Sequence, residues 1–138
     1  MKTQIGTNER QQPVIDLGHT TIFLRDDGIV QLNCSDNFTY DVPQIIENTE
    51  VIKKFANNQR VLVLNIAAPH TLVTKEVREY LTISNHYEFI ESEAYVIQTL
   101  AQSLLANFYL KNNKPNIPTR FFQSTTLAEN WLYSFRDL

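Results

Sequence analysis

Glycine and cysteine are scarce in this chain of 138 residues, and each scarcity excludes a kind of site. Its three glycines, Gly6, Gly18 and Gly28, are too few and too scattered for a loop that cradles nucleotide phosphates. Because Cys34 is the single cysteine, no disulfide can form within the chain, which favours a reducing, cytoplasmic location. No signal peptide is recognised, and no apolar run approaches the roughly 20 residues of a membrane span.

Recognisable catalytic and metal-binding patterns are also missing. His19, His70 and His86 show no short ligand spacing, so we expect no metal and no cofactor. No serine stands in a Gly-x-Ser-x-Gly turn or beside an identifiable activating histidine. These absences predict a protein that is not an enzyme.

Charge of one sign is not concentrated anywhere along the chain. The formal net charge is −3 with acids and bases mixed, which argues against a nucleic-acid partner. We expect Glu88, Glu91 and Glu93 to form an exposed acidic face. Residues 1–13 are polar and without periodicity, so we expect a flexible N-terminal arm there and a single domain over residues 14–138.

The apolar pattern predicts alternating strands and helices. Five strand-like runs occupy residues 21–25, 29–33, 61–66, 94–97 and 119–122, and residues 14–17 can begin an edge strand. Asp27-Gly28 favours a tight turn that joins the first two runs as a hairpin.

Capping residues mark the helices between these strands. Asp41 with Gln44 begins the first helix, Thr71 or Thr74 the second, and Thr99 with Gln102 the third. Residues 84–91 form either a short further helix or a continuation of the second.

The sequence also predicts the start of the final helix and the buried face of the third helix. Thr126 with Glu129 is expected to cap the final helix. The third helix is expected to bury its apolar residues, which are Leu100, Ala101, Leu104, Leu105 and Phe108.

The resulting order, β-β-α-β-α-β-α-β-α, predicts an α/β domain with a mixed five-stranded sheet, an opening hairpin and then parallel strands. Its second half carries short motifs at residues 94–97, 105–109, 113–115, 118–122 and 128–132. On these residues the chain resembles the STAS fold of SpoIIAA-type anti-sigma-factor antagonists. It resembles more closely the SpoIIAA-like, or STAS/SEC14-like, group of small bacterial proteins.

This resemblance implies a non-enzymatic regulatory domain that contacts a protein partner, which can be a second copy of itself. In the antagonists, a Ser or Thr at the start of the helix after the central strand is phosphorylated. The Asp-Ser-Ser-Gly pattern of that site is absent here, and Thr71 and Thr74 occupy the region.

The turn after the central strand is the predicted site on physical grounds as well. Ligands of open α/β sheets bind beyond the carboxyl ends of the strands, and a helix N-terminus there favours an anion. The binding or phospho-switch candidates are Asn65, His70, Thr71, Thr74 and Lys75. Ordinary helix capping by the two threonines and a solvated His70 explain the same residues.

The alternative function is the binding of a small molecule or a lipid, as in SEC14 domains. It requires an apolar cavity of roughly 300 Å³ between the sheet and a helix. Tyr80, Tyr87 and Tyr95 are the expected lining residues, with an opening near the loop after Ile66 or beneath residues 84–91.

Overall fold

The computed structural model describes residues 4–7 and 13–136. Its strands are β1 (Gln4–Thr7), β2 (Pro13–Asp16), β3 (Thr20–Leu24), β4 (Val30–Cys34), β5 (Phe38–Tyr40), β6 (Val61–Ile66), β7 (Thr71–Val73), β8 (Ile90–Val96) and β9 (Thr119–Phe122). Its helices are α1 (Val42–Ala56), α2 (Lys75–Ile83), α3 (Leu100–Asn112) and α4 (Thr125–Tyr133).

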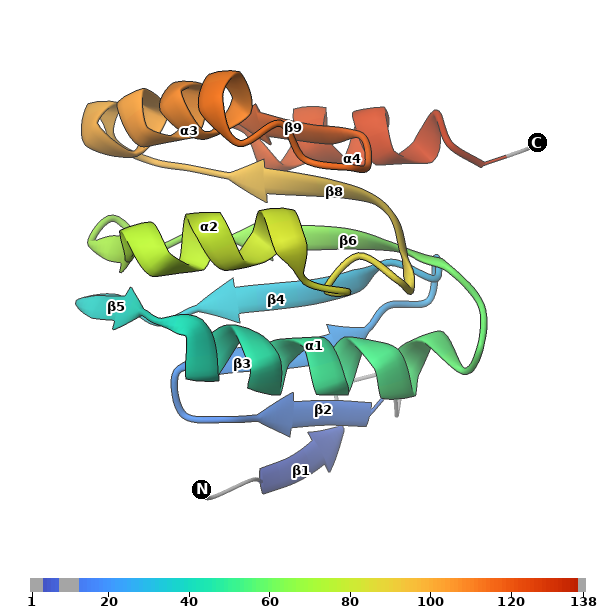
Figure 1. The fold of residues 1–138 in the computed structure, drawn as a ribbon. Coiled ribbons are helices and arrows are strands. Elements are labelled where there is room, and N and C mark those ends of the chain that lie inside the picture. The colour runs from blue at the N-terminus through green and yellow to red at the C-terminus, as the bar shows by residue number, and fades with distance from the viewer. Residues whose placement is uncertain (1–3, 8–12, 137–138) are drawn as a thin grey trace.

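The main sheet has seven strands in the order β1-β2-β3-β4-β6-β8-β9 (Figure 1). Strands β3 and β4 form the predicted antiparallel hairpin, and β6, β8 and β9 follow in parallel. These five are the five predicted strands, so the α/β class, the hairpin and the parallel order are confirmed. The predicted count of five is wrong, because β1 and β2 extend the hairpin edge and β5 and β7 form a separate two-stranded sheet.

Part of the predicted N-terminal arm is a strand. Gln4–Thr7 pairs antiparallel with Pro13–Asp16, which in turn pairs with β3. Backbone hydrogen bonding to an open sheet edge needs no apolar pattern, which explains why the sequence gives no sign of β1. The remaining arm residues, 1–3 and 8–12, lie outside the described part of the chain.

Helix α1 begins and ends as its sequence indicates. The Asp41 carboxylate accepts from the backbone N–H of Val42, and Asp41 and Gln44 form a reciprocal capping box. The helix ends at Asn57, whose φ of 50° places it in the left-handed region that stops a helix. The predicted Thr99–Gln102 capping box at the start of α3 is also confirmed.

Of the other two helix starts, one agrees with the prediction and one differs. Thr74, one of the two residues predicted for the start of α2, caps it, because residues 71–73 pair in parallel with β5 and so continue as a strand. Ser124, not Thr126, begins α4, because the Ser124 hydroxyl accepts from the backbone N–H of Leu127. Residues 84–89 form turns rather than a helix before β8 starts at Ile90.

The predicted buried face of α3 is wrong. Leu100, Leu104 and Phe108 are 76%, 62% and 54% exposed, whereas α3 buries Gln102, Ala106 and Tyr109. Apolar residues occur on every side of α3 itself, so their periodicity does not show which face of the helix is buried. Hydrogen bonds decide it, because Gln102 and Tyr109 have polar partners inside.

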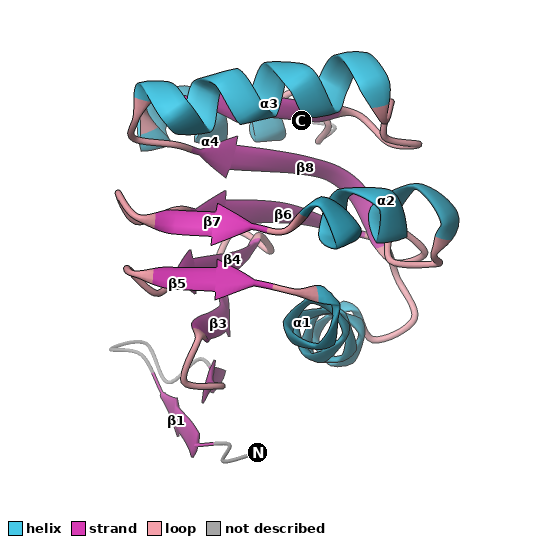
Figure 2. Cartoon of the chain, turned by 60° about the vertical axis from the view of Figure 1, so that its left-hand side comes forward, coloured by secondary structure: helices cyan, strands magenta, loops and turns pink. Residues whose placement is uncertain are grey.

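The sheet has one helix on one face and three on the other (Figures 1 and 2). Helix α4 packs Ala128 and Leu132 against alternate residues of β6 and β8, which we call the solid face. Helices α1, α2 and α3 cover the opposite face, which we call the cavity face. Successive side chains of a strand point to opposite faces, so the same strands line both.

Candidate functional site

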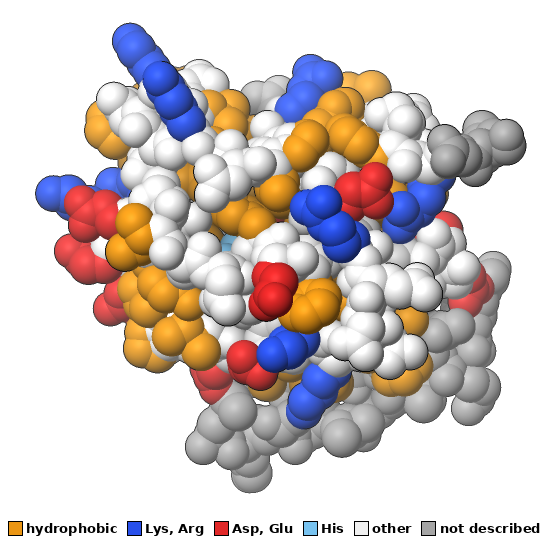
Figure 3. Space-filling model, turned by 45° about the vertical axis from the view of Figure 1, so that its right-hand side comes forward, with side chains coloured by type: hydrophobic (Ala, Val, Ile, Leu, Met, Phe, Trp, Pro, Cys, Tyr) orange, Lys and Arg blue, Asp and Glu red, His pale blue; other side chains and the backbone are white. Residues whose placement is uncertain are grey.

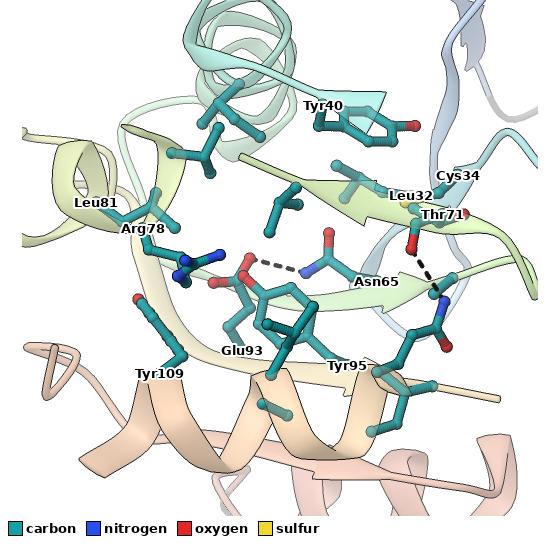
Figure 4. A pocket seen from close by; sticks show the side chains of 18 of the residues that line it. Leu32, Cys34, Tyr40, Asn65, Thr71, Arg78, Leu81, Glu93, Tyr95 and Tyr109 are labelled. Atoms are coloured by element: carbon teal, nitrogen blue, oxygen red, sulfur yellow. Dashed lines mark hydrogen bonds between the residues drawn. The ribbon is translucent and has the colours of Figure 1, made fainter. Parts of the chain in front are cut away.

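A cavity of about 170 Å³ lies on the cavity face. Strands β4, β6 and β8 form its floor, helices α1, α2 and α3 its walls, and the β5–β7 sheet closes one end (Figure 4). Most of its lining is apolar, with Leu32, Ile45, Ile52, Val77 and Leu81 among the residues. Such a cavity is the usual setting of a small-molecule site when a few polar groups converge on it.

Glu93 is the buried acid of this cavity. It stands on β8 with 2% of its surface exposed, and its Oε2 accepts from the Asn65 Nδ2 of β6 at 2.8 Å. Its Oε1 has no hydrogen-bond partner among the described residues. Within the same part of the chain no Lys or Arg forms an ion pair with Glu93, and His86 places its Nε2 3.9 Å from Oε1.

The other contact of His86 places a proton on its Nδ1. The Thr49 hydroxyl donates its one proton to the carbonyl of Ile45 at 2.8 Å, so it must accept from Nδ1 of His86 at 2.7 Å. Nδ1 therefore carries a proton, and in a neutral imidazole Nε2 is an acceptor. Nε2 faces the Glu93 carboxyl group at 3.9 Å, which is too long for a hydrogen bond to Oε1.

Asn48 contributes a second unpaired acceptor. Tyr40 donates its hydroxyl proton to the carbonyl of His19, and Thr20 lies 2.8 Å from the Tyr40 oxygen. The Asn48 Nδ2 donates to Thr20 Oγ1 at 3.4 Å, while its Oδ1 has no partner in the described chain although the residue is only 6% exposed. Asn48 lines the cavity from α1.

Three tyrosines, Tyr40, Tyr95 and Tyr109, line the cavity. Burial, followed by the Glu93 charge, raises the pKa of Tyr95 well above its usual value. Burial raises the pKa of Tyr109 to about 12, and its hydroxyl pairs at 2.8 Å with that of Tyr87. These groups stay neutral at ordinary pH. Of the tyrosines predicted to line a cavity, Tyr95 does, whereas Tyr80 and Tyr87 are not among the lining residues.

Two further side chains set the reactivity and charge of the cavity. Burial raises the pKa of the Cys34 thiol to about 11, so the thiol is protonated and a poor nucleophile near neutral pH. Arg78 of α2 lines the cavity with its guanidinium 5.9 Å from the Phe108 ring of α3. In Figure 4 the Arg78, Glu93 and Tyr109 side chains project toward the same space.

Of the five predicted site residues, Asn65 and Thr71 line this cavity. Thr71 is 8% exposed and fully engaged, since its hydroxyl donates to Ser35 O and accepts from the Ala68 N–H. Gln102 donates to the carbonyls of Ala68 and Thr71, which ties this loop to α3.

The other three predicted residues lie outside the cavity lining. Thr74 caps α2 and donates to the Asp41 carboxylate at 3.0 Å, so a negative charge already occupies that helix start. His70 is exposed beside Asp36, and Lys75 is exposed with Glu79 3.9 Å away. The structure does not bring the five together, and phosphorylation of Thr71 or Thr74 stays a prediction.

The sequence did not single out the strongest polar residues of the cavity. Glu93 was expected on an exposed face with Glu88 and Glu91, which is wrong for Glu93. The signal was present in its spacing, because Glu93 alternates with Ser92 and Ala94 along β8 and so faces α1–α3. Asn48 and His86 carry no comparable signal, since only tertiary packing brings them to β8.

The described residues contain neither a grouped set of metal ligands nor a helix that could span a membrane. No three His, Cys, Asp or Glu side chains there are grouped as metal ligands. None of the helices described is both long and apolar enough to cross a bilayer.

The sheet order and the helices on its two faces define a small α/β domain, and its fold is SpoIIAA-like. A crystal structure from Shewanella loihica PV-4, of an uncharacterized DUF3478-family protein with a SpoIIAA-like fold, matches with a TM-score of 0.55. The match covers 95% of this chain and 92% of that one at 12% identity, which supports the fold alone.

The family is defined by sequence. Residues 22–136 match the model of a domain of unknown function, DUF7793, and the chain belongs to that family. No curated protein matches this sequence significantly.

Proposed function

We propose that this protein is a non-enzymatic, STAS-like domain that binds a small molecule between its sheet and helices α1–α3. The observation that carries the proposal is the cavity of about 170 Å³, apolar over most of its lining and supplied with buried polar groups. A packed protein interior has few voids larger than a water molecule, so a void of this size is unusual.

The size of the cavity narrows the class of ligand. An apolar cavity of about 150 Å³ can take up benzene, whereas the cavity expected for a drug-sized ligand or a lipid starts at roughly 300 Å³. The proposal is therefore a compact ligand, with one ring or a short branched chain, rather than a lipid.

A binding role rather than catalysis is supported by the chemistry of the lining. Its thiol, Cys34, is protonated near neutral pH, and its tyrosines have raised pKa values. We also infer a cytoplasmic protein, because its single cysteine suits a reducing compartment.

Amide correlation spectra of the isotope-labelled protein, titrated with toluene and with indole, test the proposal. We expect saturable shift changes confined to residues around the cavity, including Ala106 and Val77. Ala106→Leu, which fills the cavity, should abolish them. Changes scattered over the surface, or equal changes in the filled variant, would contradict a cavity site.

Protein contact is the second candidate function, and the outer face of α3 favours it. Leu100, Leu104 and Phe108 lie exposed on that face. Residues 100–110 carry no charge, so two copies pairing through α3 would oppose no like charges along it. On the face drawn in Figure 3, hydrophobic side chains also reach the surface, with Lys and Arg scattered among Asp and Glu.

Sedimentation equilibrium over a wide concentration range tests this second function. We expect a concentration-dependent dimer that Leu104→Glu disrupts, while Lys75→Glu, an exposed control on α2, leaves it intact. A monomer at every concentration would contradict the proposal of self-association through α3, and it would not contradict the proposed ligand site.

A further inference from the structure

We propose that the cavity selects ligands that carry a hydrogen-bond donor, above all a small apolar amine, and that Glu93 and Asn48 receive the donor. This inference rests on the proposed ligand site and specifies its chemistry. It follows from the kind of polar atom that the cavity leaves without a partner.

Both unpaired polar atoms of the cavity lining are acceptors. Glu93 Oε1 and Asn48 Oδ1 have no partner among the described residues, although both side chains are more than nine-tenths buried. Buried polar groups are nearly always hydrogen-bonded, so two orphaned acceptors in one cavity point to a missing donor. The third unpaired buried oxygen, of Ser92, does not line the cavity.

The donors that could already serve Glu93 are committed elsewhere or fall short. Asn65 donates to Oε2, not to Oε1. The Tyr95 hydroxyl interacts with the Glu93 carboxylate, since after burial both the Glu93 charge and a hydrogen bond to Glu93 contribute to the raised pKa of Tyr95, yet Oε1 is left without a hydrogen-bond partner. His86 directs its Nδ1 proton to Thr49, and its Nε2 lies 3.9 Å from Oε1, which is beyond hydrogen-bonding distance.

An N–H or O–H placed at this point would satisfy Glu93 Oε1, and an ammonium would also balance its charge. A hydrogen bond between an ammonium and a carboxylate is stronger than one between neutral groups, so the amine is the preferred donor. Arg78 is the competing feature, because its guanidinium lines the same cavity and would favour a carboxylate ligand instead.

Four probes of one ring size separate these cases: benzylamine, benzyl alcohol, toluene and benzoate. Isothermal titration calorimetry on the full chain at pH 7 should rank benzylamine tightest, then benzyl alcohol, then toluene, with no binding of benzoate. We expect benzylamine to bind at least tenfold more tightly than toluene. Glu93→Gln should remove that tenfold preference while changing toluene affinity less than twofold.

Glu91→Gln is the matched control. It makes the same substitution two residues earlier on β8, at a side chain that pairs with Arg136 at 3.1 Å and does not line the cavity. We expect it to leave the ranking unchanged. Should Glu93→Gln fail to fold, the carboxyl carbon resonance of Glu93 in the unmodified protein replaces it, and this resonance should move with benzylamine and not with toluene.

The possible outcomes distinguish a failure of donor selection from a failure of the proposed ligand site. Equal affinity for toluene and benzylamine, insensitive to Glu93→Gln, would overturn donor selection and leave the ligand site standing. Binding of benzoate that is lost in Arg78→Gln would overturn donor selection and would indicate that the cavity binds an anionic ligand through Arg78. Failure of all four probes to bind would overturn both the ligand chemistry and the ligand site.

Discussion

The two faces of the sheet are built from the same strands and have opposite interiors. On the solid face, Leu62 and Leu64 of β6 and Ala94 of β8 are fully buried against Ala128 and Leu132 of α4. On the cavity face, the next residues of the same strands are Asn65, Glu93 and Tyr95, and they border empty space. Because strand residues alternate between faces, one strand can support stability on one side and ligand chemistry on the other.

This difference teaches where to look for function in such a domain. Polar residues on a buried strand face destabilise a fold unless they have partners. Both faces hold apolar clusters, and the solid face has one unpaired buried oxygen, that of Ser92, whereas the cavity face has two, of Glu93 and Asn48, and both residues line the cavity. A ligand in the cavity can offset the cost of the Glu93 and Asn48 oxygens but not that of Ser92.

The largest contrast between the faces should come from truncation. Leu64→Ala on the solid face should lower the free energy of unfolding by about 2–5 kcal/mol, since it opens a void in close packing. Leu81→Ala on the cavity face should cost less, because Leu81 already borders empty space and has fewer contacts to lose. Chemical denaturation of both variants measures the difference, and equal losses would contradict it.

The second-largest effect is expected at alkaline pH, which should destabilise the cavity face. The pKa of Cys34 is raised from 9.0 to about 11, so its contribution is complete below about pH 9 and is lost as pH rises toward 11. The shift corresponds to roughly 2–3 kcal/mol. Tyr109, raised from 10.0 to about 12, extends the loss to higher pH.

Denaturation at pH 7, 9 and 11 checks this order. Cys34→Ala should reduce the loss between pH 9 and 11. Tyr133→Phe should reduce it less, because Tyr133 is exposed on α4, where water screens the hydrogen bond to Asp27 that is the main cause of its raised pKa. A loss that survives Cys34→Ala unchanged would place its origin elsewhere.

Enlarging a small side chain should have opposite signs on the two faces. Ala94→Leu overpacks the solid face and should cost about 1–3 kcal/mol. Ala106→Leu extends into the cavity and should be neutral or stabilise by about 0.5–2 kcal/mol, as cavity-filling substitutions do. Thermal unfolding of the two variants decides this, and destabilisation by both would mean that the cavity face is as tightly packed as the solid face.

The smallest effect concerns the start of α2, at the edge of the cavity face. Thr74→Ala should cost about 1 kcal/mol, because Thr74 caps the helix. Thr74→Glu should cost more than Thr74→Ala, since it sets a second carboxylate beside Asp41. Equal stabilities of the two variants would show that Asp41 does not oppose an anion, and a phosphate on Thr74, at that position.

Local signals predicted much of this fold. Asp27-Gly28 set the hairpin, Asp41 and Thr99 set two helix starts, and the apolar run of β6 marked the central strand. Strands β5 and β7 could not be predicted from the sequence, since each has only three residues and each pairs only with the other.

The candidate site was less predictable than the fold. The turn after β6 was expected to carry it, and Asn65 and Thr71 do line the cavity. Its unpaired acceptors come from α1 and β8, which are brought together only by packing. The inward face of α3 was unpredictable for the same reason, because Gln102 and Tyr109 find their partners on the 68–71 loop and at Tyr87.

A crystal structure of the protein grown with benzylamine tests the central claim most directly. We predict density for one molecule inside the cavity, its ring among Ile45, Val77 and Leu81 and its nitrogen within hydrogen-bonding distance of Glu93 Oε1. A cavity filled by its own side chains, or a benzylamine whose nitrogen lies away from Glu93, would contradict the account.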